Sequence, residues 1–468
     1  MRTHAPLARG RVDCCCGVLV RGGSCCSALT LCLLDSWKRA ELLKKAAAEL
    51  REHATHIARV MMDEVAKPYA AAFSEVLRTA DLFEYTAEEG VRVSGELQLS
   101  DAFPGEKRNK LALVQRVPLG VIVAIPPYNY PLNLAGSKVG PALMAGNSIV
   151  MKPPSAGAVT CLLGIGAIMH LAGAPPGLIN VVTGKGSEIG DYLTQHRDAN
   201  AVSFTGGGTG LRVAKGAGMI PLQMELGGKD PALVLPDCNI EKTAAALVKG
   251  AFSYSGQRCT AVKVIYMIEK DGELSAKILP LILEGVKKLR VGMPWEDKVD
   301  ITPVIDGKSA AFIKGLVDDA QAKGAKLELP EGGWKQSGNL IHPVVLTGVT
   351  QEMRLMYEEQ FGPVLPIVSV PSVEEAIELA NASPLGLQAS VFTQDIDAAM
   401  SISDALQAGT IQINGAPARG PDHFPFQGFK DSGLSSQGVR YSIEKKKKRK
   451  KRQRAVVAGR EVQHRKRP

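Results

Sequence analysis

The stretch Val121-Ile-Val-Ala-Ile-Pro-Pro-Tyr-Asn-Tyr-Pro131 decides the fold. Its first five residues form a continuous apolar and mostly β-branched run, which is typical of a strand buried on both faces. The strand should end at Pro126, which has no N–H for a sheet ladder. In open α/β folds, ligands bind at the carboxyl ends of such strands. The stretch therefore predicts a parallel sheet with a site beside Asn129.

Similar apolar runs recur along the chain, with helical stretches between them. Helical patterning is present over residues 37–61, 69–89, 156–172 and 188–195. Short buried strands that alternate with helices form parallel βαβ units. The alternation resumes after residue 260, so we expect an α/β protein with two halves that join near Leu226-Gly-Gly228. The runs before residue 260 are Ser148–Met151, Leu178–Val182, Ala201–Phe204 and Pro231–Leu235.

The charge of the chain is concentrated at its ends. The 468 residues include 56 Lys and Arg and 47 Asp and Glu, for a net charge of +9. Residues 445–468 are strongly basic, whereas the part between residues 37 and 444 is slightly acidic. Because like charges repel, we expect a basic disordered tail over 445–468. Nucleic-acid binding by this tail is an alternative that we do not favour, since no aromatic side chains interleave with the charges to stack on bases.

The cysteines are also uneven, with six of the nine in residues 1–36. Adjacent cysteines lack the spacing with which two thiolates face one metal ion, so we expect no metal site. The few cysteines elsewhere favour a reducing compartment, the cytoplasm. No apolar run reaches the roughly 18 residues of a membrane helix, and we therefore expect no membrane partner.

Cys259 is the candidate nucleophile, within Tyr254-Ser-Gly-Gln-Arg-Cys-Thr260. The preceding Arg258 and nearby backbone N–H groups should lower the pKa of the thiol and favour the thiolate. Glu225, in Gln223-Met-Glu-Leu-Gly-Gly-Lys229, is a candidate general base. The amide of Asn129 could hold an oxyanion. Taken singly, each residue has an ordinary alternative: a buried core cysteine, an exposed strand-end glutamate and a turn asparagine.

Two further segments could hold a nucleotide. Gly206 and Gly207 lie in a glycine-rich turn between an expected strand and helix, where backbone can approach a phosphate. Turns use glycine as well, so this signal is weak alone. Lys152 and Ser155 end another strand and could hold a ribose or its phosphate, and Ser155 should also cap the next helix.

Together these motifs resemble the aldehyde dehydrogenase superfamily over residues 37–444. The resemblance rests on Pro-Tyr-Asn-Tyr-Pro, Met-Glu-Leu-Gly-Gly-Lys and Gly-Gln-Arg-Cys in chain order, with Glu358–Val364 and Pro425–Gly433 in addition. It implies two doubly wound parallel-sheet domains with a small oligomerisation element. The implied dinucleotide-binding domain covers 37–98 and 119–227, a bridging hairpin covers 99–118, and the catalytic domain covers 228–430. Residues 1–36 match nothing in the family.

Within the superfamily the chain is most similar to non-phosphorylating, NADP-dependent glyceraldehyde-3-phosphate dehydrogenases. Supporting segments include Thr183–Gly190 and Pro417–Phe426. The resemblance implies that Arg258 and Arg419, assisted by Arg92 and Tyr130, hold a substrate phosphate. It also implies a homo-oligomer, although the basic run after Glu444 replaces the family's last strand. Two alternatives remain. The chain could act on another aldehyde, or it could be an inactive scaffold with a nucleic-acid-binding tail.

The resemblance also implies a mechanism and a cofactor. Cys259 would attack the aldehyde, Asn129 would hold the oxyanion, and Glu225 would activate water to hydrolyse the thioester. Glu359 and Phe361 would hold the nicotinamide ribose and ring. Many NAD-using relatives carry Glu at the position of Ser155, where a carboxylate would repel a 2′-phosphate. Ser155 and Lys152 therefore favour NADP over NAD.

Overall fold

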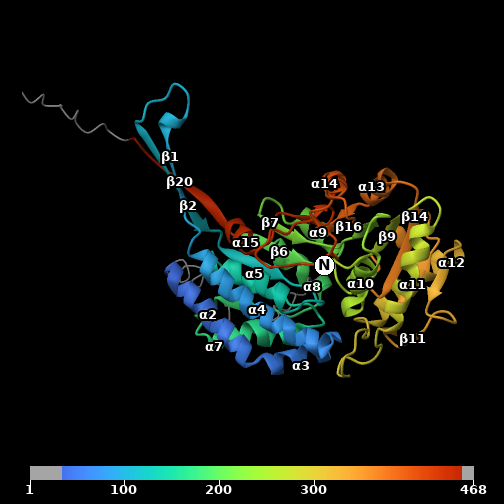
Figure 1. Cartoon of the computed structure of the whole chain (residues 1–468). Helices are drawn as coiled ribbons and strands as arrows, with labels where there is room; N and C mark the ends of the chain where they lie inside the picture. Colours follow the sequence, from blue (N-terminus) through green and yellow to red (C-terminus); the bar gives the residue numbers. More distant parts are fainter. Residues whose placement is uncertain (1–33, 456–468) are drawn as a thin grey trace, which may run out of the picture.

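The computed structural model describes residues 34–455, which form two α/β units and a projecting antiparallel arm (Figure 1). The α/β class expected from the sequence is confirmed. The predicted Cys-rich segment lies outside the described residues, apart from its last three positions. No helix among the described residues is long and apolar enough to cross a membrane.

The first unit is built on a six-stranded sheet in the order β19-β7-β6-β3-β4-β5. The four pairings among β3 to β7 are parallel, and only β19 runs antiparallel to its neighbour. The strands are β3 (Val121–Ile125), β4 (Ser148–Met151), β5 (Ile179–Val181), β6 (Ala201–Thr205), β7 (Leu222–Glu225) and β19 (Gly433–Leu434). The helices are α2 (Ser36–Glu52), α3 (Ala54–Val65), α4 (Tyr69–Gly90), α5 (Asn133–Met144), α6 (Ala158–Cys161), α7 (Ile168–Leu171), α8 (Gly186–Thr194), α9 (Thr209–Gly216) and α15 (Val439–Lys445).

The helical stretch expected over residues 37–61 is divided. α2 ends at Glu52 and α3 begins at Ala54, because His53 leaves the helical conformation at φ −95° and ψ 10°. Both helices keep the predicted apolar face, since Leu43, Leu50 and Ile57 are buried in one core with α4 and α5. The interruption therefore bends the helical path without changing the side that packs.

The second unit is built on a seven-stranded sheet in the order β10-β13-β14-β9-β8-β16-β17, in which only β10 is antiparallel to its neighbour. Its strands are β8 (Pro231–Val234), β9 (Val264–Ile268), β10 (Lys326–Leu329), β13 (Val344–Thr347), β14 (Val364–Val370), β16 (Gln388–Phe392) and β17 (Thr410–Ile413). Its helices are α10 (Ile240–Phe252), α11 (Glu273–Lys287), α12 (Gly307–Ala322), α13 (Val373–Ala382) and α14 (Ile396–Ala405). Two pairs of very short strands complete it: β11 (Gln336–Ser337) with β12 (Leu340–Ile341), and β15 (Leu385–Gly386) with β18 (Phe429–Lys430).

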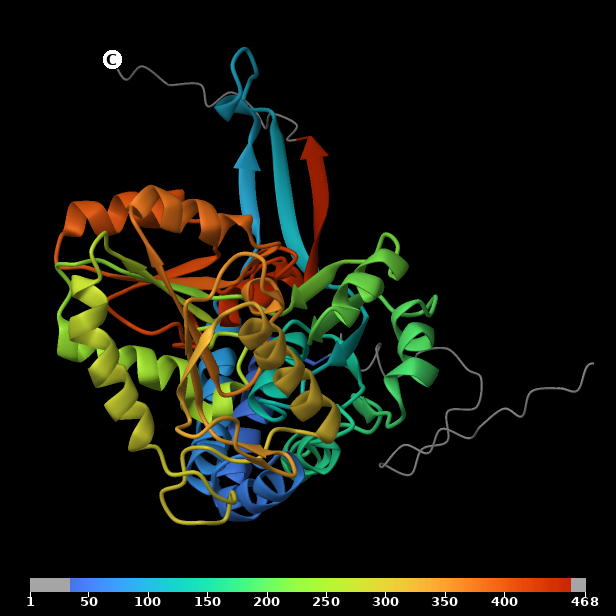
Figure 2. The ribbon, with the colours of Figure 1, turned by 90° about the vertical axis from the view of Figure 1, so that its right-hand side faces the viewer.

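The arm is a three-stranded sheet in the order β1-β2-β20 that extends away from both units (Figures 1 and 2). It consists of β1 (Glu96–Leu99), β2 (Lys110–Pro118) and β20 (Lys447–Ala455). The hairpin thus begins three residues before the predicted range of 99–118. The apolar side chains of Leu97 and Leu113 are opposite one another in the pairing and are largely exposed.

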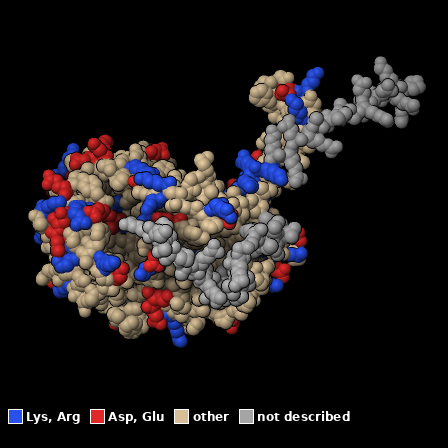
Figure 3. Space-filling view, turned by 180° about the vertical axis from the view of Figure 1, so that it is seen from behind, with Lys and Arg blue, Asp and Glu red and all other residues tan. Residues whose placement is uncertain are grey.

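The prediction of a disordered tail is wrong for residues 447–455. β20 pairs antiparallel with β2 along its whole length, from Pro118 opposite Lys447 to Lys110 opposite Ala455. A strand turns successive side chains to opposite faces, which separates neighbouring charges, and the ladder to β2 adds backbone hydrogen bonds. Lys and Arg side chains gather where the arm meets the body (Figure 3). Residues 456–468 lie outside the described part of the chain.

The order of the first sheet determines where a ligand can bind. The chain passes from β3 to β4 and β5 on one side, and then returns to form β6 and β7 on the other side of β3. Such a reversal of strand order opens a crevice at the carboxyl ends of the two strands that flank it. The crevice therefore lies after Ile125 and Thr205, the last residues of β3 and β6.

Candidate active site

The predicted catalytic residues converge on this crevice. Asn129 follows β3, and Glu225 is the last residue of β7, paired in register with Thr205 of β6. The Cys259 sulfur lies 4.0 Å from Glu225 Oε1. Three chain segments that are far apart in the sequence thus meet at one edge of the sheet, as the motifs predicted.

A strained turn presents Cys259. Tyr254 and Ser255 both adopt left-handed backbone angles, with φ of 51° and 53°, which side-chain-bearing residues rarely occupy. The turn is held in place by neighbouring groups: the Ser255 hydroxyl accepts from the Thr302 N–H and donates to its carbonyl, at 2.9 and 2.8 Å. Behind Cys259, Lys263 donates to the Cys259 carbonyl at 2.9 Å. Strain at such a position is typical of functional turns.

The expectation that Arg258 activates the thiol is wrong for this arrangement. Burial and then the negative charge of Glu225 raise the pKa of Cys259 to about 12, against a smaller opposing effect of Lys263. The Arg258 guanidinium turns instead to the carbonyl of Gly250, at 2.6 Å. The thiol is therefore protonated at neutral pH, and Glu225 is the acceptor within reach for its proton.

Glu225 is oriented by two donors besides its contact with the thiol. The side chain is 1% exposed, and its Oε2 accepts from Arg419 Nη1 at 2.5 Å and from the Thr205 hydroxyl at 3.2 Å. Thr205 in turn accepts from the fully buried Lys138 of α5 at 2.6 Å. No motif pointed to Lys138, although a lysine within the apolar run of α5 is a signal of a buried, partnered charge.

A buried ion pair holds the turn that carries Asn129. Lys67 is paired with Glu75 and donates to the Asn129 carbonyl at 2.6 Å. Glu75 also accepts from the backbone N–H groups of Leu132 and Asn133, each at 3.0 Å. The Asn129 amide points toward the nucleophile turn, where its Nδ2 donates to the Gln257 carbonyl at 3.0 Å.

We expect Glu75→Ala to destabilise the protein by about 3–5 kcal/mol, because it leaves Lys67 as an uncompensated buried charge. Denaturant unfolding would measure this cost. The matched control is Glu84→Ala, which removes a carboxylate from the same helix that forms only an exposed ion pair with Arg51. Its expected cost is below about 1 kcal/mol. Equal costs for the two variants would contradict the structural role of Glu75.

The glycine-rich turn after β6 leaves room for a nucleotide. A Cβ built on Gly207 or Gly208 meets no atom within 4 Å, so the backbone there borders open space. A Cβ on Gly206 would approach the Phe204 ring to 2.9 Å, which explains the glycine at that position. The turn leads directly into α9, whose N–H groups suit a phosphate. The residues present therefore suit a dinucleotide in this crevice.

Lys152 and Ser155 lie at the end of the neighbouring β4. Lys152 is buried, and burial lowers the pKa of its amine. Ser155 is exposed, and the prediction that it caps the next helix is wrong, since α6 starts at Ala158 with Gly157 as its N-cap. The first turn of α6 is capped from α3 instead, where Glu64 accepts from the Val159 and Thr160 N–H groups.

Glu359 and Phe361 approach the site from the second unit. Glu359 accepts from the Gly228 N–H at 3.3 Å and pairs with Lys263 at 3.0 Å. Phe361 has a left-handed φ of 43° and packs edge-on against Tyr128, which follows β3. Lys263, to which no sequence motif pointed, thus joins Glu359 to the Cys259 turn.

The structure brings together some of the expected substrate arginines but not all. Arg419 lies against Glu225 and also donates to Gln437 Oε1 at 2.6 Å. Its loop is held by Arg78 of α4, which donates to the Arg419 carbonyl at 2.9 Å and pairs with Asp422 at 2.7 Å. Tyr130 lies beside Lys67, whose amine is 3.7 Å from the centre of its ring.

The assignment of Arg92 to this group is wrong. Its side chain is 68% exposed and pairs only loosely with Glu89, at 3.8 Å. It lines a shallow hollow with Trp37 and Lys44 of α2. Arg92 follows the end of α4, and at about 1.5 Å of rise per residue the last residue of α4, Gly90, lies about 18 Å from Arg78. The residue that α4 contributes to the Arg419 loop is Arg78, which its sequence context did not distinguish from other helix arginines.

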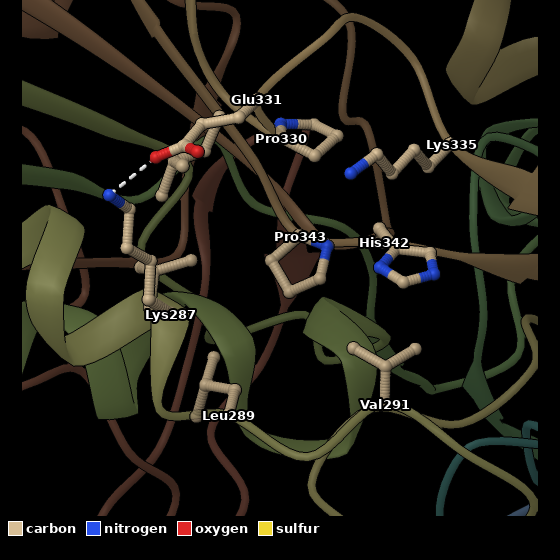
Figure 4. Close-up of a pocket in the computed structure, with 10 residues that line it drawn as sticks. Lys287, Leu289, Val291, Pro330, Glu331, Lys335, His342 and Pro343 are labelled. Atoms are coloured by element: carbon tan, nitrogen blue, oxygen red, sulfur yellow. Dashed lines mark ion pairs between the residues drawn. The ribbon is translucent and has the colours of Figure 1, made fainter.

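Another hollow, of about 270 Å³, lies in the second unit between the end of α11 and the strands near β10 (Figure 4). Lys335 and His342 point into it, and Lys287 pairs with Glu331 at its rim at 2.6 Å. It contains none of the predicted catalytic residues. The crevice at Cys259 is therefore the candidate active site.

Comparison with known proteins identifies relatives of this chain. The wheat NADP-dependent glyceraldehyde-3-phosphate dehydrogenase is 58% identical over 409 residues, which is 87% of this chain and 81% of the relative. A 3-sulfolactaldehyde dehydrogenase from Priestia aryabhattai is 36% identical over 87% of this chain and 84% of its own length. The crystal structure of the Bacillus halodurans NADP-dependent glyceraldehyde-3-phosphate dehydrogenase complexed with NADP superimposes with a TM-score of 0.89 at 46% identity, covering 92% of this chain and 89% of that one.

A family model extends the match beyond the range that the motifs indicated. The model of the aldehyde dehydrogenase family matches residues 31–451, which includes most of β20. The Lys-rich last strand therefore occupies a family position, although its composition gave no sign of this. From the site geometry, the fold and these matches, the chain belongs to the aldehyde dehydrogenase family.

Proposed function

We propose that the chain oxidises glyceraldehyde 3-phosphate to 3-phosphoglycerate with NADP, and that water is the final acceptor. The observation that carries this proposal is the convergence of Cys259, Glu225 and Asn129 beside a crevice that suits a dinucleotide. The relatives named NADP-dependent glyceraldehyde-3-phosphate dehydrogenase support the choice of substrate and cofactor.

The proposed reaction has two stages, formation of a thioester on Cys259 and its hydrolysis. Glu225 accepts the thiol proton, and the Cys259 thiolate attacks the aldehyde carbon, while Asn129 Nδ2 stabilises the oxyanion. NADP, when bound, supplies the nicotinamide carbon that accepts the hydride. After Glu225 has released the thiol proton to solvent, it removes a proton from water, whose oxygen attacks the thioester carbon, and the Cys259 thiolate leaves. Gly206, Gly207, Lys152 and Ser155 would hold the nucleotide, and Glu359 with Phe361 its nicotinamide end.

The substrate phosphate is proposed to bind at Arg258 and Arg419. Arg258 Nε is buried without a partner in the described residues, and so is Nε2 of Gln437, the residue that accepts from Arg419. Buried donors without acceptors are costly, and phosphate oxygens would satisfy them. We further propose that Tyr130 borders this phosphate and that Arg78 supports it through the Arg419 loop.

We expect Arg78→Ala to raise the KM for glyceraldehyde 3-phosphate about 10- to 100-fold, because the Arg419 loop loses a charged donor worth about 1.5–3 kcal/mol. The KM for unphosphorylated glyceraldehyde should change little. Steady-state kinetics with both aldehydes measure the difference. Arg92→Ala, just beyond the end of the same helix, is the matched control and should leave both KM values unchanged. A larger effect of Arg92→Ala than of Arg78→Ala would restore the original assignment.

We expect Ser155→Glu to shift the cofactor preference toward NAD by about 10-fold or more, because a carboxylate there repels a 2′-phosphate. A tenfold change in preference corresponds to about 1.4 kcal/mol. The ratio of kcat/KM for NADP and NAD gives the readout. Glu64→Gln, which leaves Ser155 in place, controls for disturbance of the nearby α6. An unchanged ratio in Ser155→Glu would show that Ser155 does not face the 2′-phosphate.

The proposed substrate is tested by incubating the full chain with glyceraldehyde 3-phosphate and NADP, and following nicotinamide reduction. Unphosphorylated glyceraldehyde and 3-sulfolactaldehyde are run in parallel, because a relative acts on the latter and it is also anionic. A kcat/KM highest for glyceraldehyde 3-phosphate supports the proposal. A higher kcat/KM for either of the other aldehydes would show that the proposed substrate is wrong, while the proposed reaction at Cys259 would still hold.

Other aspects of the proposal concern assembly and location. We propose the division into domains given above, with the hairpin β1–β2 and β20 forming an oligomerisation arm in a homo-oligomer, since Leu97 and Leu113 are exposed on it. We also propose the cytoplasm as the compartment, because Cys161, Cys238 and Cys259 are free thiols.

A further inference from the structure

The hollow between α11 and β10 is lined by both apolar and basic side chains (Figure 4). Its volume of about 270 Å³ is just below the range of about 300–1,000 Å³ that is typical of small-molecule sites. Its apolar lining includes Leu289, Val291, Pro330 and Pro343. The hollow is therefore too small for a dinucleotide, but it suits a molecule with a short hydrocarbon body.

Two basic side chains enter the hollow from the ends of one short hairpin. Lys335 precedes β11 and His342 follows β12, and the His342 N–H donates to the Lys335 carbonyl at 3.1 Å. Both side chains point into the hollow (Figure 4). Within residues 34–455, neither the Lys335 amine nor the His342 ring makes a hydrogen bond or an ion pair. The two groups are thus free to bind a ligand.

The charges that line the hollow leave an excess of positive charge. The lining that the structure describes includes one carboxylate, Glu331, which pairs at 2.6 Å with Lys287, the last residue of α11. Lys287, and more weakly Lys335, lowers the pKa of Glu331. Burial and then the charge of Lys335 lower the pKa of His342. An anion between Lys335 and His342 would offset this repulsion and would favour the protonated imidazole.

We propose that this hollow is a binding site for a small organic anion, whose carboxylate or phosphate group lies between Lys335 and His342 and whose short hydrocarbon body packs against Leu289 and Val291. Charged donors form stronger hydrogen bonds to such a head group than neutral donors do. The hydrocarbon adds a contribution that scales with the apolar area removed from water. The proposal does not depend on the proposed function, because none of the predicted catalytic residues lines the hollow.

The test is isothermal titration calorimetry of the full chain at pH 6 with four probes. Hexanoate and hexyl phosphate carry both parts of the proposed ligand, inorganic phosphate has only the head group, and hexanol has only the chain. Only binding that Lys335→Gln weakens is assigned to the hollow. There, hexanoate and hexyl phosphate should bind about tenfold or more tighter than the other two probes, and the tighter of them identifies the preferred head group. No binding of hexanoate, or equal affinity for all four probes, would overturn the proposal.

Substitutions of single lysines locate the binding. Lys335→Gln removes a charge from the hollow and should weaken hexanoate binding about fivefold or more. Lys335→Arg keeps the charge and should stay within about threefold of wild type. The matched control is Lys326→Gln, which removes the same charge from an exposed lysine of β10 that pairs with Glu328 outside the hollow. Unchanged binding in Lys335→Gln, or an equal loss in Lys326→Gln, would contradict the assignment to this hollow.

The pH dependence of hexanoate binding tests the part of His342. The affinity should rise about threefold or more as the pH falls from 7.5 to 5.5, because a bound carboxylate favours the protonated imidazole. The other charges that face His342 keep their sign over this range, since Lys335 and Lys287 stay protonated and the lowered pKa of Glu331 keeps it ionised. The rise should be absent in His342→Gln. A constant affinity in wild type, or the same rise in His342→Gln, would overturn the proposal.

Discussion

Cys259→Ser is expected to lower kcat by about 10⁴-fold or more, to the background of the assay. The serine hydroxyl is a much weaker nucleophile than the thiolate, and loss of a covalent nucleophile removes effects of this order. Because Cys259 is only partly exposed and makes no bond on which the strained turn depends, the variant should fold as wild type does. NADPH formation with glyceraldehyde 3-phosphate is the measurement.

The control for this variant is Cys238→Ser, at a buried cysteine in the core of the second unit. It should cost stability but retain activity in the folded protein. Cofactor binding by Cys259→Ser, measured by fluorescence titration with NADP, should equal that of wild type. A rate within tenfold of wild type in Cys259→Ser would contradict the covalent mechanism.

Glu225→Gln is expected to stop the reaction at the thioester. The amide cannot accept the proton of water, and loss of a general base lowers a rate by about 10²–10⁴-fold. The variant should therefore produce one equivalent of NADPH per chain, with the Cys259 proton passing to solvent instead of to Glu225, followed by very slow turnover. Intact-protein mass spectrometry should find the 3-phosphoglyceroyl group on Cys259.

Glu225→Gln has a second, independent consequence. Removal of its negative charge should lower the pKa of Cys259, because that charge is the second cause of the raised value after burial. Alkylation of the thiol by iodoacetamide at pH 8 should thus be faster in the variant than in wild type, even though hydrolysis is slower. Steady turnover at the wild-type rate, without a burst, would exclude Glu225 as the base.

Much of this site was predictable because its residues lie next to strong patterns. Asn129 and Glu225 follow apolar β-branched runs, and strand ends in a parallel sheet meet at one edge. Cys259 was identified by the motif around it. The α/β class followed from the same alternation of short buried strands and helices. Local sequence determines where these elements end, and the sheet then brings them together.

The residues that were missed act across the fold. Lys138, Lys263 and the pair Lys67–Glu75 lie in segments whose local pattern describes only a helix or strand. Their partners, such as the Asn129 carbonyl 62 positions from Lys67, are fixed by tertiary packing. The strand β20 was missed for a related reason, since its lysines predict repulsion while its pairing to β2 is a long-range contact. The resemblance led to Arg92 and not to Arg78 because none of its motifs lies in α4, so no local pattern indicated which arginine meets the Arg419 loop.

The most direct test of the central claim, that Cys259 carries an acyl group which Glu225 transfers to water, is product formation without inorganic phosphate. The full chain is incubated with glyceraldehyde 3-phosphate and NADP in a phosphate-free buffer, and 3-phosphoglycerate and NADPH are quantified together. The structure predicts equal amounts of both products, at a rate that added phosphate does not raise. A reaction that requires phosphate and yields an acyl phosphate would contradict the account.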